Sequence, residues 1–152
     1  MYVKVNNNSV EKYPYSIAEL KIDNPQTSFP DVISSELLAE WNVFSVRTTH
    51  QPDHNFRTQN VKEINPQLID GEWTQSWIVE DASESEINQR RLDAENNIRS
   101  ERNQKLEETD WIVTKSLELN QSIPENYVSY RQALRDITQQ ETFPWHVDWP
   151  IL

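Results

Sequence analysis

The sequence predicts an α+β protein, with a strand-rich N-terminal module over residues 1–81 and a helical hairpin with an aromatic tail over residues 82–152. Two observations lead to this prediction. Asp70-Gly71 separates two stretches of alternating polar and apolar residues, which is typical of a β-hairpin. A capping box at Ser83–Glu86 then begins a stretch without proline or glycine to about residue 109, which is typical of a long helix. Strands followed by helices define the α+β class.

The first elements of the N-terminal module are short. Tyr2–Val5 and Val10–Tyr13 read as two strands joined by asparagines, and Pro14 is expected to end their pairing. Ser16 followed by Glu19 has the spacing of a capping box and begins a short helix. A second short helix and a further strand are expected at Ser35–Trp41 and Val43–Val46.

The predicted hairpin joins Val61–Ile69 to Glu72–Glu80 and carries two of the six tryptophans. Alternation places Trp73, Trp77 and Val79 on one face of the second strand. This face can form core by packing against the helices, or it can be an exposed platform that stacks on sugar rings. Tryptophan serves cores and interfaces alike, and we favour the core.

The long helix is unusually polar. Ile87, Ala94 and Ile98 form only a thin apolar seam, and its next positions fall on Glu101 and Lys105. Such a helix cannot be held in place by burial alone. It is expected either to stand out from the domain or to lie against another chain.

The second helix of the hairpin follows a connection over Asp110–Gln121. Ser122 and Glu125 have the spacing of a third capping box at its start. An apolar stripe at helical spacing is formed by Ile123, Tyr127, Tyr130, Leu134 and Ile137. The tail Phe143–Leu152 is rich in proline and tryptophan, so it is expected to be extended and to pack back.

Composition restricts the partners. The 152 residues contain 25 acidic and 14 basic side chains, which gives a formal net charge of −11. So negative a surface repels nucleic acid and anionic lipid, and neither is an expected partner. The absence of cysteine excludes disulfides and thiol chemistry, and a single glycine excludes glycine-rich phosphate loops. No apolar run is long enough for a membrane span, so the chain is expected to be soluble and cytoplasmic at synthesis.

No residue pattern indicates catalysis. His50, Asp53 and His54 are close in sequence, but Pro52 disfavours the helix that would align the two histidines as metal ligands, and a polar loop is expected. His146 is expected to be packed and hydrogen-bonded. Nucleophile elbows need glycines that are missing here. We therefore expect no enzyme, no catalytic residue, no metal and no cofactor.

Two arginines flank the stripe of the last helix. Arg131 and Arg135 are spaced to pair with Asp110 or Asp136, or else to solvate the helix edge. We favour pairing.

These residues belong to a longer pattern: an arginine-bearing helix ending in Asp110-Trp111, a Tyr-Arg-x-x-Leu-Arg-Asp helix at Tyr130–Asp136, and an aromatic tail with Phe143-Pro144 and Trp149-Pro150. The pattern, over about residues 99–150, resembles the phage tail assembly chaperone family. The resemblance implies structural roles for Asp110, Trp111, Tyr130, Arg131, Leu134, Arg135, Asp136, Phe143 and Trp149.

The resemblance implies a non-enzymatic bacteriophage tail accessory protein. Its partner would be a tail fibre or another tail or baseplate protein, bound in the host cytoplasm during assembly, and retention in the virion is left open. Partner contacts are expected at Ile87, Ala94, Ile98, Trp145 and Trp149, and the long helix also offers a surface for self-association. The alternatives are a permanent structural subunit, such as a fibre or baseplate adaptor, and a host-glycan-binding module.

Overall fold

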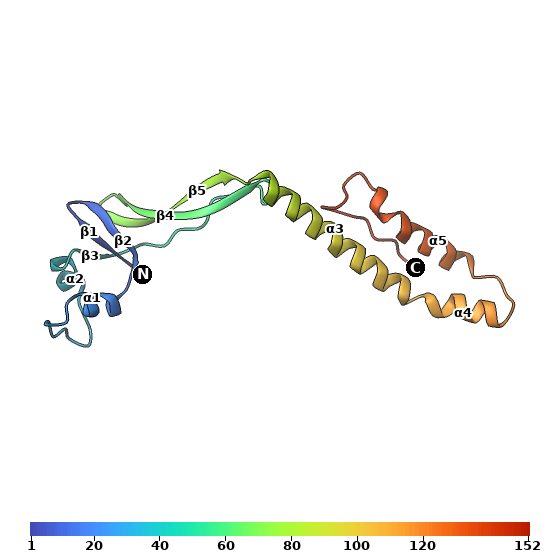
Figure 1. The fold of residues 1–152 in the computed structure, drawn as a ribbon, viewed down its shortest axis with the longest axis horizontal. Coiled ribbons are helices and arrows are strands. Elements are labelled where there is room, and N and C mark those ends of the chain that lie inside the picture. Colours follow the sequence, from blue (N-terminus) through green and yellow to red (C-terminus); the bar gives the residue numbers. More distant parts are fainter. The chain divides into compact units, whose positions relative to one another are not determined.

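The computed structural model describes residues 1–152, and it confirms the α+β class. The chain divides into two compact units, Met1–Asp81 and Ala82–Leu152 (Figure 1). The first unit contains, in order, β1 (Tyr2–Asn6), β2 (Ser9–Tyr15), α1 (Ile17–Asp23), α2 (Ser35–Glu40), β3 (Val43–Ser45), β4 (Gln59–Ile69) and β5 (Glu72–Asp81). The second contains α3 (Glu84–Glu107), α4 (Asp110–Glu118), α5 (Glu125–Arg135) and the 3-10 helix η1 (Asp136–Gln139).

The N-terminal unit is built on a three-stranded antiparallel sheet of order β2-β1-β3. The prediction that Pro14 ends the first pairing is wrong, because β2 continues through Pro14 to Tyr15, which lies opposite Tyr2. An irregularity in the register lies between Tyr2 and Lys4. Proline is tolerated at such a bulge on an edge strand because no ladder hydrogen bond is lost there.

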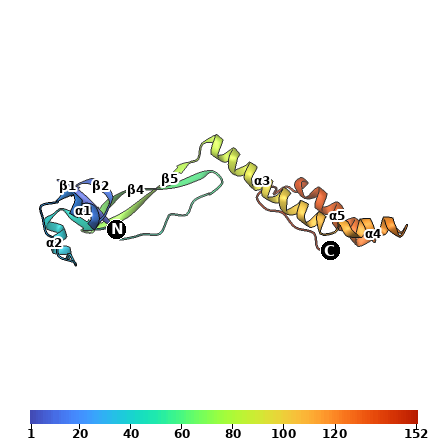
Figure 2. The same cartoon turned by 60° about the horizontal axis from the view of Figure 1, so that its bottom comes forward.

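Helices α1 and α2 cover one face of this sheet (Figure 2). α1 begins with the predicted capping box, in which the Ser16 hydroxyl accepts a hydrogen bond from the backbone N–H three residues on. Leu20 of α1 and Leu38 of α2 are buried together with Tyr15 and Val43 of the sheet. Their burial fixes the two short helices, which are too short to be stable alone.

The hairpin of β4 and β5 contributes to the other face of the sheet. Its turn is Asp70-Gly71, with φ of 52° and 83°, as the sequence predicts. Trp73 packs against Val3, Val5 and Val46 and is 9% exposed. The prediction that helices pack on this tryptophan is wrong. Its partners lie on β1 and directly after β3, because alternation along β1 places Val3 and Val5 on the face opposite the helices.

The rest of β5 is held by the chain segment that follows β3. The Arg47 N–H donates to the Trp73 carbonyl, and the Gln75 N–H donates to the Arg47 carbonyl, both at 2.8 Å. The half-buried Trp77 donates its indole N–H to the Thr49 hydroxyl at 3.0 Å. Trp73 and Trp77 therefore do not form an exposed aromatic pair.

A hydrogen bond between Tyr13 and Glu63 links β2 to β4. Burial, and secondly this bond, raise the pKa of Tyr13 from 10.0 to about 12. A raised pKa in the folded state adds stability that is fully present below pH 10 and is lost as the pH rises through about 12.

We therefore expect Tyr13 to ionise late when tyrosinate absorbance is followed against pH. The component of the titration that Tyr13→Phe removes should be centred well above pH 10. Removal of a component centred at pH 10 would show that Tyr13 is neither buried nor bonded in solution.

The C-terminal unit is a helical hairpin in which α5 runs back along α3 and α4 (Figure 1). α3 is 24 residues long, begins with the predicted Ser83–Glu86 capping box and buries none of its side chains. The predicted connection over Asp110–Gln121 is wrong for most of its length, because α4 occupies it. The signal for α4 is the i, i+4 pair Ile112 and Ser116, both buried, in a stretch free of proline and glycine.

The predicted third capping box is also absent from the start of α5. Pro124 occupies the N-cap position with φ −57° and ψ 138°, and no side chain caps the helix. The Pro124 carbonyl accepts the backbone N–H groups of Tyr127 and Val128 at 3.0 and 3.1 Å. Pro124 thus takes the N-cap position directly before Glu125, the first residue of α5, and Ser122 does not cap the helix.

Candidate partner-binding surface

The junction between α3 and α4 is held by one arginine of α5. Arg131 donates from Nη1 to the Leu106 carbonyl at 2.8 Å and to the Thr109 hydroxyl at 2.5 Å. Its Nη2 donates to Asp110 Oδ1 at 2.7 Å. We call these four residues the arginine junction. The planar guanidinium suits it, because it serves three acceptors at once.

The arginine junction lies between exposed and buried surroundings. The side chain of Arg131 is 11% exposed, whereas that of Asp110 is 59% exposed. The hydroxyl of Thr109, which is buried, also donates to the Leu106 carbonyl at 2.9 Å. The charge of Arg131 is therefore satisfied by two neutral oxygens as well as by a carboxylate. Of the alternatives, Arg131 forms the pair with Asp110, and Arg135 is exposed.

Further motif residues pack beside this junction. Trp111 of α4 and Tyr127 of α5 meet edge to face, with ring centroids 6.3 Å apart. Lys115 Nζ lies 5.8 Å from the Trp111 ring centroid, although that tryptophan remains 54% exposed. Leu134 and Ile137 are fully buried. Asp136 accepts hydrogen bonds from Gln132 and Gln139, and Tyr130 is half-buried.

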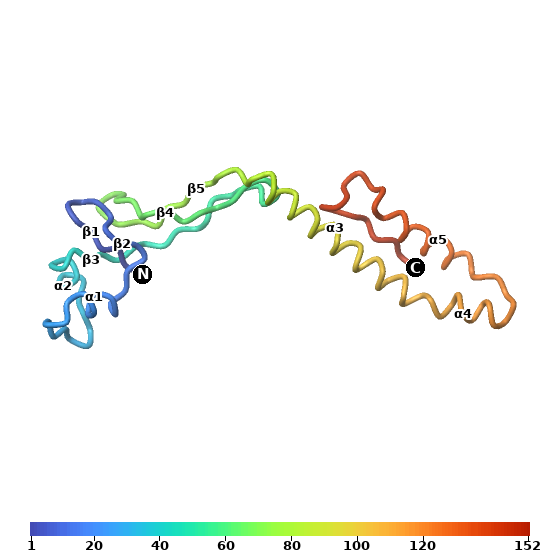
Figure 3. Tube along the Cα trace, viewed as in Figure 1, coloured from blue at the N-terminus to red at the C-terminus, as the bar shows by residue number.

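The aromatic tail runs back alongside α3 (Figure 3), and two cations of α3 lie over its aromatic rings. The Arg99 guanidinium lies 5.8 Å from the Phe143 ring centroid, and Lys105 Nζ lies 5.2 Å from that of Trp149. Cation–π contacts of this kind contribute about 0.5–1 kcal/mol each at exposed sites. They let a helix without buried side chains hold a tail.

Two hydrogen bonds fix the course of the tail. The side-chain amide of Gln140 donates to the Asp148 carbonyl at 2.9 Å and accepts the Asp148 N–H at 2.7 Å. Val147 is 8% exposed, and Pro144 is also buried. The prediction of a packed His146 is wrong: its side chain is 69% exposed and lies 3.5 Å from Asp148.

The five side chains predicted to contact a partner all lie in this unit and are all partly exposed. Ile87, Ala94 and Ile98 lie along one stripe of α3. Trp145 and Trp149 lie in the tail, and Lys105 brings Trp149 onto α3. Sequence reasoning missed the roles of Arg99, Lys105 and Gln140. The ring partners of the two cations are distant in sequence, and Gln140 bonds to backbone groups, so no local pattern signals these contacts.

The loop histidines do not come together as ligands. His50, Asp53 and His54 are exposed, and His54 Nδ1 lies 3.3 Å from the Pro52 carbonyl oxygen. No group of three or more histidine, cysteine, aspartate or glutamate side chains is placed to hold a metal ion. None of the helices combines the length and the apolar character needed to cross a membrane.

The motif residues hold the helical hairpin and its tail together. Their contacts are those of side chains that pack a small helical unit. The family model described as phage tail assembly chaperone protein matches residues 95–152 of the chain. The resemblance is thus confirmed for the segment from the middle of α3 to the C-terminus, and it supports an accessory role in phage tail assembly. No curated protein matches the chain, and no solved structure matches it.

Proposed function

We propose that this chain is a non-enzymatic accessory protein of bacteriophage tail assembly that binds an unassembled tail fibre protein and keeps it competent to assemble. The family match over residues 95–152 supports the assembly role. Work in the host cytoplasm follows from that role, because the partner is bound before it joins the tail.

The observation that carries partner binding is α3 itself. It is 24 residues long and buries no side chain, so it gains little from packing in this unit. Its partly exposed apolar stripe, formed by Ile87, Ala94 and Ile98, is the surface that a partner would complete. Trp145 and Trp149 would extend this surface, since tryptophan contributes strongly to interfaces.

A host-glycan role through Trp73 and Trp77 has less support. Trp73 is 9% exposed, and Trp77 is half-buried with its indole N–H bonded to Thr49. Sugar stacking needs an open aromatic face, and these two side chains do not offer one together.

The stripe is tested by placing a charge on it. Ile87→Glu should reduce co-purification of the tail fibre protein of the same phage about tenfold, because it buries a carboxylate in the interface. Leu92→Glu is the matched control: Leu92 is 49% exposed on the same helix, but lies off the stripe. Thermal unfolding followed by circular dichroism checks that both variants keep the helix.

The experiment distinguishes a wrongly assigned contact surface from a wrongly assigned partner. Equal fibre recovery with Ile87→Glu and Leu92→Glu would show that the stripe is not the contact surface. Failure of the wild-type chain to retain fibre at all would contradict fibre binding itself.

A further inference from the structure

Helix α4 carries a tryptophan that is held in place but not covered. Trp111 is 54% exposed. The Tyr127 ring packs against it edge to face, and Lys115 Nζ lies 5.8 Å from its ring centroid. Because both neighbours restrict the indole, little side-chain freedom remains to be lost when another protein covers it. Trp111 therefore has the properties of a pre-organised anchor residue of an interface.

A leucine on the same side of α4 extends this exposed surface. Trp111, Lys115 and Leu119 follow one another at i, i+4 and i+8, so they share one face of the helix. The helical turn continues to Leu119, whose N–H donates to the Lys115 carbonyl at 3.1 Å. Leu119 is also 54% exposed, and the aliphatic stem of Lys115 adds apolar surface to the stripe. We call these three residues the Trp111 face.

The acidic side chains near this face in the sequence are uncompensated. The stretch 107–128 holds five acidic residues and one basic residue. On α3, by contrast, Glu95 pairs with both Arg91 and Arg99. Carboxylates without a partner favour basic side chains on whatever protein covers the apolar face. Four of the five acidic residues are exposed and form no ion pair, namely Glu107, Glu108, Glu118 and Glu125.

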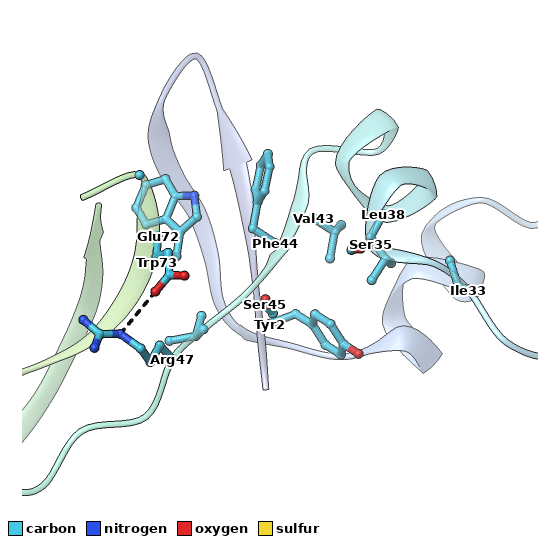
Figure 4. A pocket seen from close by; sticks show the side chains of 12 residues that line it. Tyr2, Ile33, Ser35, Leu38, Val43, Phe44, Ser45, Arg47, Glu72 and Trp73 are labelled. Carbon is cyan, nitrogen blue, oxygen red and sulfur yellow. Dashed lines mark ion pairs between the residues drawn. The ribbon is translucent and has the colours of Figure 1, made fainter. Parts of the chain in front are cut away.

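A groove in the N-terminal unit also has apolar walls, which include Leu38, Phe44 and Trp73 (Figure 4). Its volume is about 480 Å³. However, Val43 and Trp73, which line it, are only 1% and 9% exposed, because they belong to the two core clusters. They have little surface left for a partner. The groove also lies outside residues 95–152, the segment that the family model matches, whereas the Trp111 face lies inside it.

We propose that the Trp111 face binds an apolar segment of the unassembled tail fibre protein that is flanked by lysine or arginine. This inference rests on the proposed function and adds a second contact surface to the stripe of α3. Covering the indole and the leucine removes apolar surface from water, which supplies affinity. The unpaired glutamates select a basic segment over an acidic one and speed the encounter with it.

Two substitutions test this contact. Trp111→Ala removes the anchor, and Leu119→Glu places a carboxylate on the face at a residue that is more than half exposed. Each should reduce recovery of the tail fibre protein of the same phage with the tagged chain about tenfold or more. Thermal unfolding followed by circular dichroism checks that both variants are folded.

Leu117→Glu is the matched control. Leu117 is 76% exposed on the same helix. It lies about 120° around the helix axis from Trp111, so the same charge placed there should leave fibre recovery unchanged.

A second measurement uses the wild-type chain alone and in complex with fibre. Hydroxyl-radical footprinting, read by mass spectrometry, should show that oxidation of Trp111 and Leu119 falls in the complex, while oxidation of Leu117 does not. The recovered complex should also dissociate as the ionic strength of the wash rises, because salt screens the attraction between the glutamates and a basic segment.

Other outcomes would overturn the inference. Fibre recovery that both variants leave unchanged, with Trp111 oxidised equally in the complex, would reject the Trp111 face. If Ile87→Glu still reduces recovery in that case, the proposed function stands. Protection of Trp111 that appears with rising concentration of the chain alone would assign the face to a second copy. Failure of the wild-type chain to retain fibre would reject both proposals.

Discussion

Truncation after Thr138 should cause the largest loss of stability in the C-terminal unit. It removes the buried Val147 and the contacts of Phe143 and Trp149 with cations of α3. Burial of one aliphatic side chain alone contributes about 1.5–3 kcal/mol, so we expect a loss of at least about 2–3 kcal/mol. Urea unfolding followed by circular dichroism measures it, and aggregation or lost partner binding should accompany it.

The matched control is truncation after Pro150. It removes only Ile151 and Leu152, which are 95% and 53% exposed, and it should leave the unfolding midpoint nearly unchanged. Truncation after Thr138 that leaves a soluble, equally stable and binding-competent protein would show that the tail is dispensable.

The second large effect is expected at the arginine junction. Arg131→Met keeps most of the side-chain volume but leaves the buried Thr109 hydroxyl and the Leu106 carbonyl without the guanidinium. Hydrogen bonds to charged groups contribute about 1.5–3 kcal/mol, and we expect a loss of this size in the free energy of unfolding. Chemical denaturation of the purified variant measures it.

Arg135→Met is the control for this substitution. Arg135 lies on the same helix and is exposed, so its replacement should change stability by no more than about 0.5 kcal/mol. Arg131→Lys should recover only part of the loss, because a point charge cannot reach all three acceptors. Equal stability of Arg131→Met and Arg135→Met would contradict the role given to the junction.

The elements with strong local signals were predicted from the sequence. Asp70-Gly71 takes positive φ at both positions, and the hairpin follows directly. The capping boxes at Ser16 and Ser83 form both of their hydrogen bonds. In each case neighbouring residues determine the structure, so a pattern of a few residues is sufficient.

The missed elements depend on tertiary contacts or on competing local signals. At Ser122 the capping spacing is present, but Pro124 takes the N-cap position instead. The sequence pattern misses α4 because its buried positions are Ile112 and Ser116, and serine does not register as an apolar position.

The tail shows the same limit at the candidate site. Its packing on α3 uses Arg99 and Lys105, which a sequence pattern assigns to a solvated helix face. Only the fold brings these cations to Phe143 and Trp149.

The soluble yield of the tail fibre protein, expressed with and without this chain, is the most direct measurement of an assembly role. We predict that fibre is recovered in soluble form only, or mainly, when the chain is present, and that a tag on the chain retains it. Fibre that is equally soluble without the chain, together with a chain that elutes alone, would contradict that role.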